Sequence, residues 1–137
     1  MGIFNIFGKK DVSAELVQAS PYRISTEWVP YRLYANRQNS VSLMVKVKNM
    51  TSEVLLTSVV AELPKQLGFD EMRVAKEREL RLGKMAPNEE REVRFEVFSD
   101  INSDAGEYTV TVTSIAHYLD YGHVINAVKK RTTVGVV

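Results

Sequence analysis

The chain lacks cysteine altogether, and its 137 residues include only one tryptophan and two histidines. Without thiols it can form no disulfide, no thiolate metal site and no cysteine nucleophile, and this composition fits a reducing compartment. Basic and acidic residues are nearly balanced, with a net charge of +1, so the basic excess typical of nucleic-acid-binding domains is missing. The composition therefore predicts no nucleic-acid partner.

Motifs that carry catalysis are missing as well. The sequence contains no glycine-rich phosphate loop, no serine nucleophile elbow and no HExxH helix, so we expect neither enzyme activity nor a cofactor. Its length is close to the commonest size of a single domain, and a domain of this size can bury a core without cross-links. We therefore expect one folded unit.

The first ten residues carry apolar side chains followed by lysines, and the apolar stretch is too short for a secretory signal or a membrane span. We therefore expect a cytoplasmic location, with residues 1–20 as an extension of a domain at 21–137. Two alternatives remain for the extension. It is a poorly ordered or packed terminus, or Ile3, Phe4 and Phe7 form one face that docks onto a partner or a membrane surface.

From about residue 21 onward, apolar and polar residues alternate with a period of two, which is the pattern of strands with one face in water. No segment carries a helical pattern long enough for a βαβ crossover, so the strands predict an antiparallel sandwich. Gly83 is expected to end one strand, and 65–76 is left open as a loop, a helical turn or an edge strand at 73–75. The expected strands lie within 22–28, 41–48, 54–63, 80–82, 93–98, 108–113 and 123–137.

Residues of one strand parity share a face of a sheet, and this rule predicts the core. The expected core residues are Leu43, Val45, Val47, Leu82, Val93, Phe95, Val97, Tyr108, Val110 and Val112. Asn49, Met50 and Thr51 match a glycosylation acceptor, but after a strand and without an export signal they are better interpreted as a turn.

Three short stretches, at 45–49, 82–90 and 104–108, resemble archaeal and bacterial immunoglobulin-like modules of the CARDB type. The resemblance implies an all-β, immunoglobulin-like sandwich of about seven to nine strands and says little about function. It places Asn88 in a turn where the family usually has glycine, and Tyr108 where such sandwiches have a tyrosine corner. The single copy and the missing export signal depart from the family, whose modules usually repeat in surface-attached proteins.

One constellation has the chemistry of a metal site. Both histidines of the chain and an aspartate, His117, Asp120 and His123, lie around a glycine-bearing hairpin turn. Imidazole and carboxylate groups bind zinc and similar ions if the turn brings them together. The alternative is that all three are ordinary residues of a solvated turn.

Aromatic residues gather in the first strand region, where Trp28, Tyr31 and Tyr34 follow one another closely. Such residues belong either to the core or to an exposed patch that serves as an interaction surface. The leading hypothesis is a non-catalytic interaction or assembly module with a protein partner or a homo-oligomer. Its rivals are a weak metal-dependent site at 117–123 and recruitment to a membrane or partner through the N-terminal segment.

Overall fold

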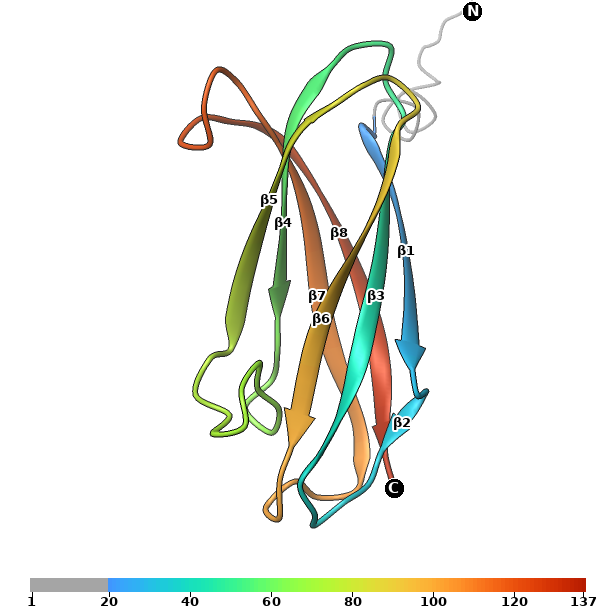
Figure 1. The fold of residues 1–137 in the computed structure, drawn as a ribbon, viewed down its shortest axis with the longest axis vertical. Helices are drawn as coiled ribbons and strands as arrows, with labels where there is room; N and C mark the ends of the chain where they lie inside the picture. The colour runs from blue at the N-terminus through green and yellow to red at the C-terminus, as the bar shows by residue number, and fades with distance from the viewer. Residues whose placement is uncertain (1–19) are drawn as a thin grey trace, which may run out of the picture.

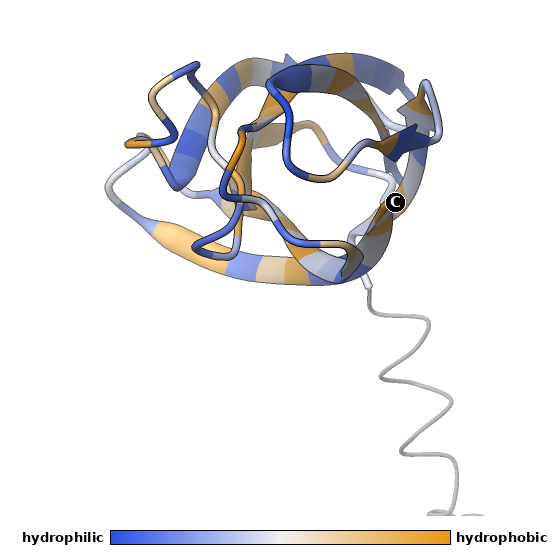
Figure 2. Ribbon diagram, turned by 90° about the horizontal axis from the view of Figure 1, so that it is seen from below, coloured by the Kyte–Doolittle hydropathy of each residue, from blue (hydrophilic) through white to orange (hydrophobic). Residues whose placement is uncertain are grey.

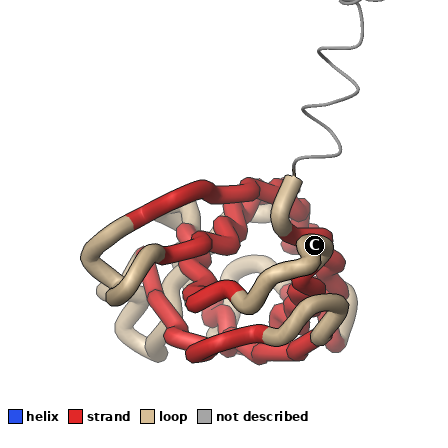
Figure 3. The backbone as a smooth tube through the Cα atoms, turned by 90° about the horizontal axis from the view of Figure 1, so that it is seen from above, coloured by secondary structure: helices blue, strands red, loops and turns tan. Residues whose placement is uncertain are grey.

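The computed structural model describes residues 20–137, and this part of the chain contains strands and loops without a helix (Figures 1 and 3). It therefore has no helix that could cross a membrane. The eight strands confirm the predicted all-β class and strand number. They are β1 (Tyr22–Val29), β2 (Arg32–Leu33), β3 (Asn39–Asn49), β4 (Leu55–Glu62), β5 (Glu77–Met85), β6 (Glu90–Ser99), β7 (Gly106–His117) and β8 (Val124–Val136).

Two sheets pack face to face as an immunoglobulin-like sandwich. One sheet has the strand order β1-β3-β6 and the other β2-β8-β7-β4-β5. The pairs are antiparallel except for the short contact of β2 with β8, which is parallel. The hairpin predicted between the last two long strands is present as β7–β8. Figure 2 shows apolar and polar residues alternating along the strands, as expected when one face of each sheet is buried.

The predicted core lies between the sheets. Of the ten expected residues, seven are buried, and Leu82, Val93 and Tyr108 are partly buried and packed against them. Leu82 is only partly buried because the register of β4 with β5 shifts there: Thr57 faces Gly83 and Ser58 faces Arg81, which leaves Leu82 as an extra residue. Gly83 occupies the bulge with a φ of +77° and does not end the strand, which continues to the buried Met85.

The segment left open by the sequence, 65–76, is an irregular loop, and no edge strand forms at 73–75. The loop closes one end of the core with the buried side chains of Leu67 and Phe69. Gly68 and Phe98 exchange two backbone hydrogen bonds, of 3.1 and 2.8 Å, in a single bridge. Backbone pairing to β6 and apolar burial therefore hold this loop without regular structure.

Two turn features implied by the sequence are confirmed. Asn88 has a φ of +64°, a conformation that asparagine adopts more readily than other residues with side chains. The Tyr108 hydroxyl donates a hydrogen bond of 2.7 Å to the Asp104 carbonyl, which is the geometry of a tyrosine corner.

Tyr108→Phe removes that hydrogen bond while keeping the ring, so we expect the free energy of unfolding to fall by about 0.5–1.5 kcal/mol. Urea unfolding measures this loss as a lower midpoint. Tyr118→Phe is the matched control, because Tyr118 is exposed and lies just beyond the other end of the same strand. Equal midpoints for the two variants would contradict a stabilising role for the corner.

Candidate functional site

The structure does not bring the three predicted metal ligands together. His117 ends β7 opposite Val124, and the next residue, Tyr118, donates its backbone N–H to the His123 carbonyl at 2.8 Å. Opposite residues of an antiparallel pair share a face, so this register places the two imidazole rings on opposite faces. Residues 20–137 contain no group of three histidine, aspartate or glutamate side chains that could hold a metal ion. The three-ligand geometry expected at the hairpin is therefore not formed.

His117 is instead a buried part of the sheet. Its Nε2 lies 2.7 Å from the Ser58 hydroxyl on β4, and its ring meets the Tyr121 ring edge-on at 5.0 Å. Its Nδ1 has no hydrogen-bond partner within 20–137. The sequence could not show this burial, because it depends on the pairing of β7 with β4 and on the turn folding back over the sheet.

Asp120 and His123 do meet, on the exposed side of the turn. Nδ1 of His123 lies 2.8 Å from Oδ1 of Asp120, and the Gly122 N–H donates to the same oxygen at 2.9 Å. These hydrogen bonds, that of His123 first, lower the pKa of the Asp120 carboxyl below its usual value. The pair stabilises the turn, and two exposed groups do not make a metal centre.

The aromatic residues singled out in the sequence divide between the interior and the surface. Trp28 is partly buried against the core, and its Nε1 donates a hydrogen bond of 3.0 Å to Thr132 on β8. It therefore links the two sheets. Tyr31 and Tyr34 are exposed, at 71% and 42% of their full accessible surface. Ile3, Phe4 and Phe7 lie outside the described residues.

The two tyrosines alternate with arginines that sequence analysis did not single out. The Arg32 guanidinium lies 5.1 Å from the Tyr31 ring centre and 5.6 Å from that of Tyr34. The Arg37 guanidinium lies 5.3 Å from the centre of the Tyr34 ring. We call Tyr31, Arg32, Tyr34 and Arg37 the tyrosine–arginine surface. The close spacing of tyrosine and arginine within 31–37 is the sequence feature from which this surface could have been predicted.

The backbone beneath the tyrosine–arginine surface is firmly held. Leu33, between the two tyrosines, is fully buried. Asn39 accepts a hydrogen bond from the Tyr34 N–H and donates one to the Tyr34 carbonyl, each at 3.0 Å. Ala35 donates to the Val137 carbonyl, and Val137 donates to that of Leu33. The exposed side chains therefore project from a fixed support.

The charges of this surface have no partners of opposite sign in the described part of the chain. Five ion pairs occur there, and neither Arg32 nor Arg37 belongs to any of them. Stacking on an aromatic ring satisfies only the face of a guanidinium and leaves its N–H donors free for a carboxylate. The surface can therefore bind an acidic group and an apolar group side by side.

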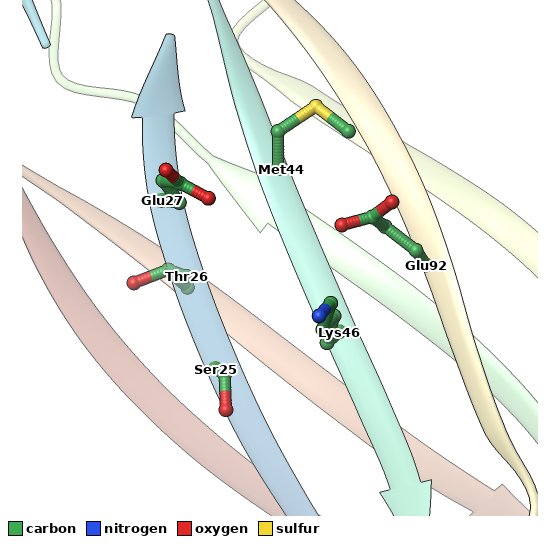
Figure 4. Close-up of a pocket in the computed structure, with 6 residues that line it drawn as sticks. All are labelled: Ser25, Thr26, Glu27, Met44, Lys46 and Glu92. Carbon is green, nitrogen blue, oxygen red and sulfur yellow. The ribbon is translucent and has the colours of Figure 1, made fainter.

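A shallow depression lies on the outer face of the three-stranded sheet (Figure 4). Lys46 of β3 lies opposite Glu92 on one neighbouring strand and Ser25 on the other, and Met44 lies next to it. The depression has a volume of about 130 Å³. A usual small-molecule site has a volume of several hundred Å³. Its mixed charges are those of an ordinary solvated sheet face.

A larger groove, of about 450 Å³, is lined by residues of the β7–β8 turn and of the β3–β4 loop. Figure 1 shows these two segments at the same end of the sandwich. Its lining is mostly apolar and includes the exposed side chains of Val54, Leu119 and Ile125. Glu53 and Lys84 supply its charges, and His117 also borders it. We call this the hairpin groove.

No protein-family model and no curated protein matches this chain. Among solved structures it is similar to the ASH / PapD-like domain 7 of human CEP192, with a TM-score of 0.45 and 9% identity over 88% of this chain and 87% of that one. It is also similar to a conjugative transposon lipoprotein from Bacteroides eggerthii, with a TM-score of 0.44 and 10% identity over 85% of this chain and 98% of the other.

Proposed function

We propose that this protein is a non-catalytic, cytoplasmic interaction module that binds a protein partner through the tyrosine–arginine surface. The observation that carries the proposal is the set of exposed, mutually stacked tyrosine and arginine side chains on a fixed backbone. Tyrosine and arginine are enriched among the residues that dominate binding energy at protein interfaces. Rigid support lowers the entropy that binding must overcome.

The chemistry of the surface indicates the kind of partner. Within residues 20–137, Arg32 and Arg37 form no ion pair, and guanidinium donors pair best with carboxylates in a bidentate geometry. The tyrosine rings offer apolar faces, and the exposed Val29 at the end of β1 lies two residues before Tyr31. The preferred partner is therefore a protein segment that combines acidic residues with apolar or aromatic ones.

We also infer a relationship to CARDB-type modules at the level of the domain. Its support is local: the positive φ of Asn88 in the turn and the hydrogen bond of Tyr108 at the corner. The relationship adds no partner, and the binding proposal depends on the tyrosine–arginine surface alone.

Selection of peptides from a random displayed library tests the binding proposal. We expect the enriched peptides to carry acidic residues beside aromatic ones and to shift the backbone amide resonances of 31–37. Arg32→Glu and Tyr34→Ala should each weaken binding by at least tenfold, or about 1.4 kcal/mol. Tyr118→Ala is the control, because it removes an exposed tyrosine from the opposite end of the sandwich.

Sedimentation of the protein over a range of concentrations tests whether a second copy is the partner. Self-association that Arg32→Glu abolishes and Tyr118→Ala preserves would support the proposal, with the homo-oligomer as the complex. Peptide binding or self-association that is unaffected by Arg32→Glu and Tyr34→Ala would overturn the proposal. A protein that neither binds selected peptides nor self-associates would also overturn it.

A further inference from the structure

The hairpin groove leaves apolar side chains in water on a well-anchored support. Leu119 and Ile125 are 78% and 57% exposed, and Val54 faces them from the β3–β4 loop. Leu119 has a φ of +70°, which residues with branched side chains rarely adopt. Apolar groups held outward in an uncommon conformation indicate a surface that something covers.

The first wall of the groove, the β7–β8 turn, is fixed to β5, the edge strand of the same five-stranded sheet. The Tyr121 hydroxyl accepts a hydrogen bond of 2.9 Å from the Gly83 N–H on β5. The Arg81 guanidinium lies 4.6 Å from the centre of the Tyr121 ring. The turn therefore cannot fold over Leu119 without breaking its contacts with β5, and the groove is already formed.

The second wall, the β3–β4 loop, lies beside the point where the described chain begins. Asn49 donates to the Glu53 carbonyl at 2.8 Å and so fixes the loop that carries Glu53 and Val54. At the start of the same loop, Met50 donates its N–H to the Pro21 carbonyl at 2.8 Å. Figure 1 shows the start of β1 and this loop at the same end of the sandwich. The described chain therefore begins beside this wall, and residues 1–19, which we call the tethered segment, precede that point in the sequence.

The tethered segment has the composition that the groove requires. Ile3, Phe4, Ile6 and Phe7 supply four large apolar side chains within five positions, and Lys9 and Lys10 follow them. The groove carries one charge of each sign, Glu53 and Lys84, so apolar contact is the main attraction for the segment. Twelve residues separate Phe7 from Ser20, and the thirteen Cα-to-Cα steps between them span up to roughly 43 Å when extended, more than enough to reach an adjacent wall.

We propose that residues 3–7 of this chain occupy the hairpin groove of the same molecule. Burial of the phenylalanines against Leu119, Ile125 and Val54 supplies the driving force, since apolar surface of both the segment and the groove is removed from water. The short tether favours a molecule's own segment over that of a second copy, because a local concentration in the millimolar range exceeds ordinary protein concentrations. The groove and the tyrosine–arginine surface lie at opposite ends of the sandwich, so this proposal is independent of the binding proposal.

The absence of cysteine makes a direct test possible in the full-length chain. Asn5→Cys creates a unique thiol for a nitroxide spin label, whose unpaired electron broadens the resonances of nearby amide protons. We expect strong broadening at Val54, Leu119 and Ile125 in dilute ¹⁵N-labelled protein. Leu119→Asp should abolish it by placing a charge in the groove, whereas Ile101→Asp, at a comparably exposed residue outside the groove, should preserve it.

A mixed sample separates the two sources of the segment. Spin-labelled protein without ¹⁵N is combined with ¹⁵N protein that carries no label, so that only contacts between molecules cause broadening. Broadening of the groove in the mixed sample at the strength seen in the single-species sample would overturn the proposal in favour of a second copy. Broadening elsewhere, no broadening, or broadening that survives Leu119→Asp would also overturn it.

Discussion

Phe95→Ala is expected to lower the free energy of unfolding by about 3–5 kcal/mol, the usual loss for a buried aromatic ring replaced by alanine. Phe95 lies on the inner face of β6 opposite Leu43 of β3, and it is 2% exposed. Its ring centre is 5.9 Å from that of Phe69, in the loop that closes the core. The substitution therefore opens a cavity between a sheet and a loop and removes contacts with both.

Urea unfolding followed by circular dichroism measures the effect. Phe98→Ala is the matched control, because Phe98 lies on the same strand with the opposite parity and is only partly buried. We expect its midpoint to fall by much less than that of Phe95→Ala. If the two variants unfold at the same urea concentration, Phe95 is not a central core residue.

Asn49→Ala is expected to cost roughly 2–4 kcal/mol, because a fully buried side chain with several backbone partners is lost. The Asn49 amide donates to the Glu53 and Met85 carbonyls at 2.8 and 3.0 Å, and its oxygen accepts from the Thr51 N–H at 2.9 Å. Alanine leaves these groups without their partner in the interior. The predicted turn after β3 is thus confirmed, and the side chain of Asn49, the last residue of β3, holds it through these hydrogen bonds.

Thermal and urea unfolding report the loss, and Asn126→Ala, at an exposed position of β8, is the control. Asn49→Asp separates hydrogen bonding from size. It keeps the shape but replaces the amide donors with a carboxylate that faces carbonyl oxygens, so we expect a loss at least as large as that of Asn49→Ala. Full stability of Asn49→Asp would show that the donors contribute nothing.

Much of the fold could be predicted from local features of the sequence. Alternation in 41–47 and 108–113 is sufficient to identify strands and their buried faces, because the side-chain period of a strand is two. Tyr108 and Asn88 were predictable for a similar reason, since a corner and a tight turn depend on residues only a few positions apart. Gly83 was misjudged because glycine serves bulges as well as strand ends, and only pairing with β4 distinguishes them.

The candidate sites were less predictable, because they depend on contacts between distant residues. Tyr31 and Tyr34 were expected as possible interaction residues and are exposed, but Trp28 turns inward to Thr132, more than a hundred positions away. Arg32 and Arg37 lie beside the tyrosine rings because the backbone of 33–39 is held in place by contacts with distant strands.

The sequence by itself determined an all-β chain, its strand faces, its turns and its lack of thiol chemistry, because each follows from neighbouring residues. The tertiary structure alone decided the register of the last hairpin. A shift between Ala116 and His117 places His117 opposite Val124, so the two histidines face away from each other. Register is set by the packing of whole strands, and a slip of one residue reverses every face. The same packing brings the β3–β4 loop beside the β7–β8 turn and so forms the hairpin groove.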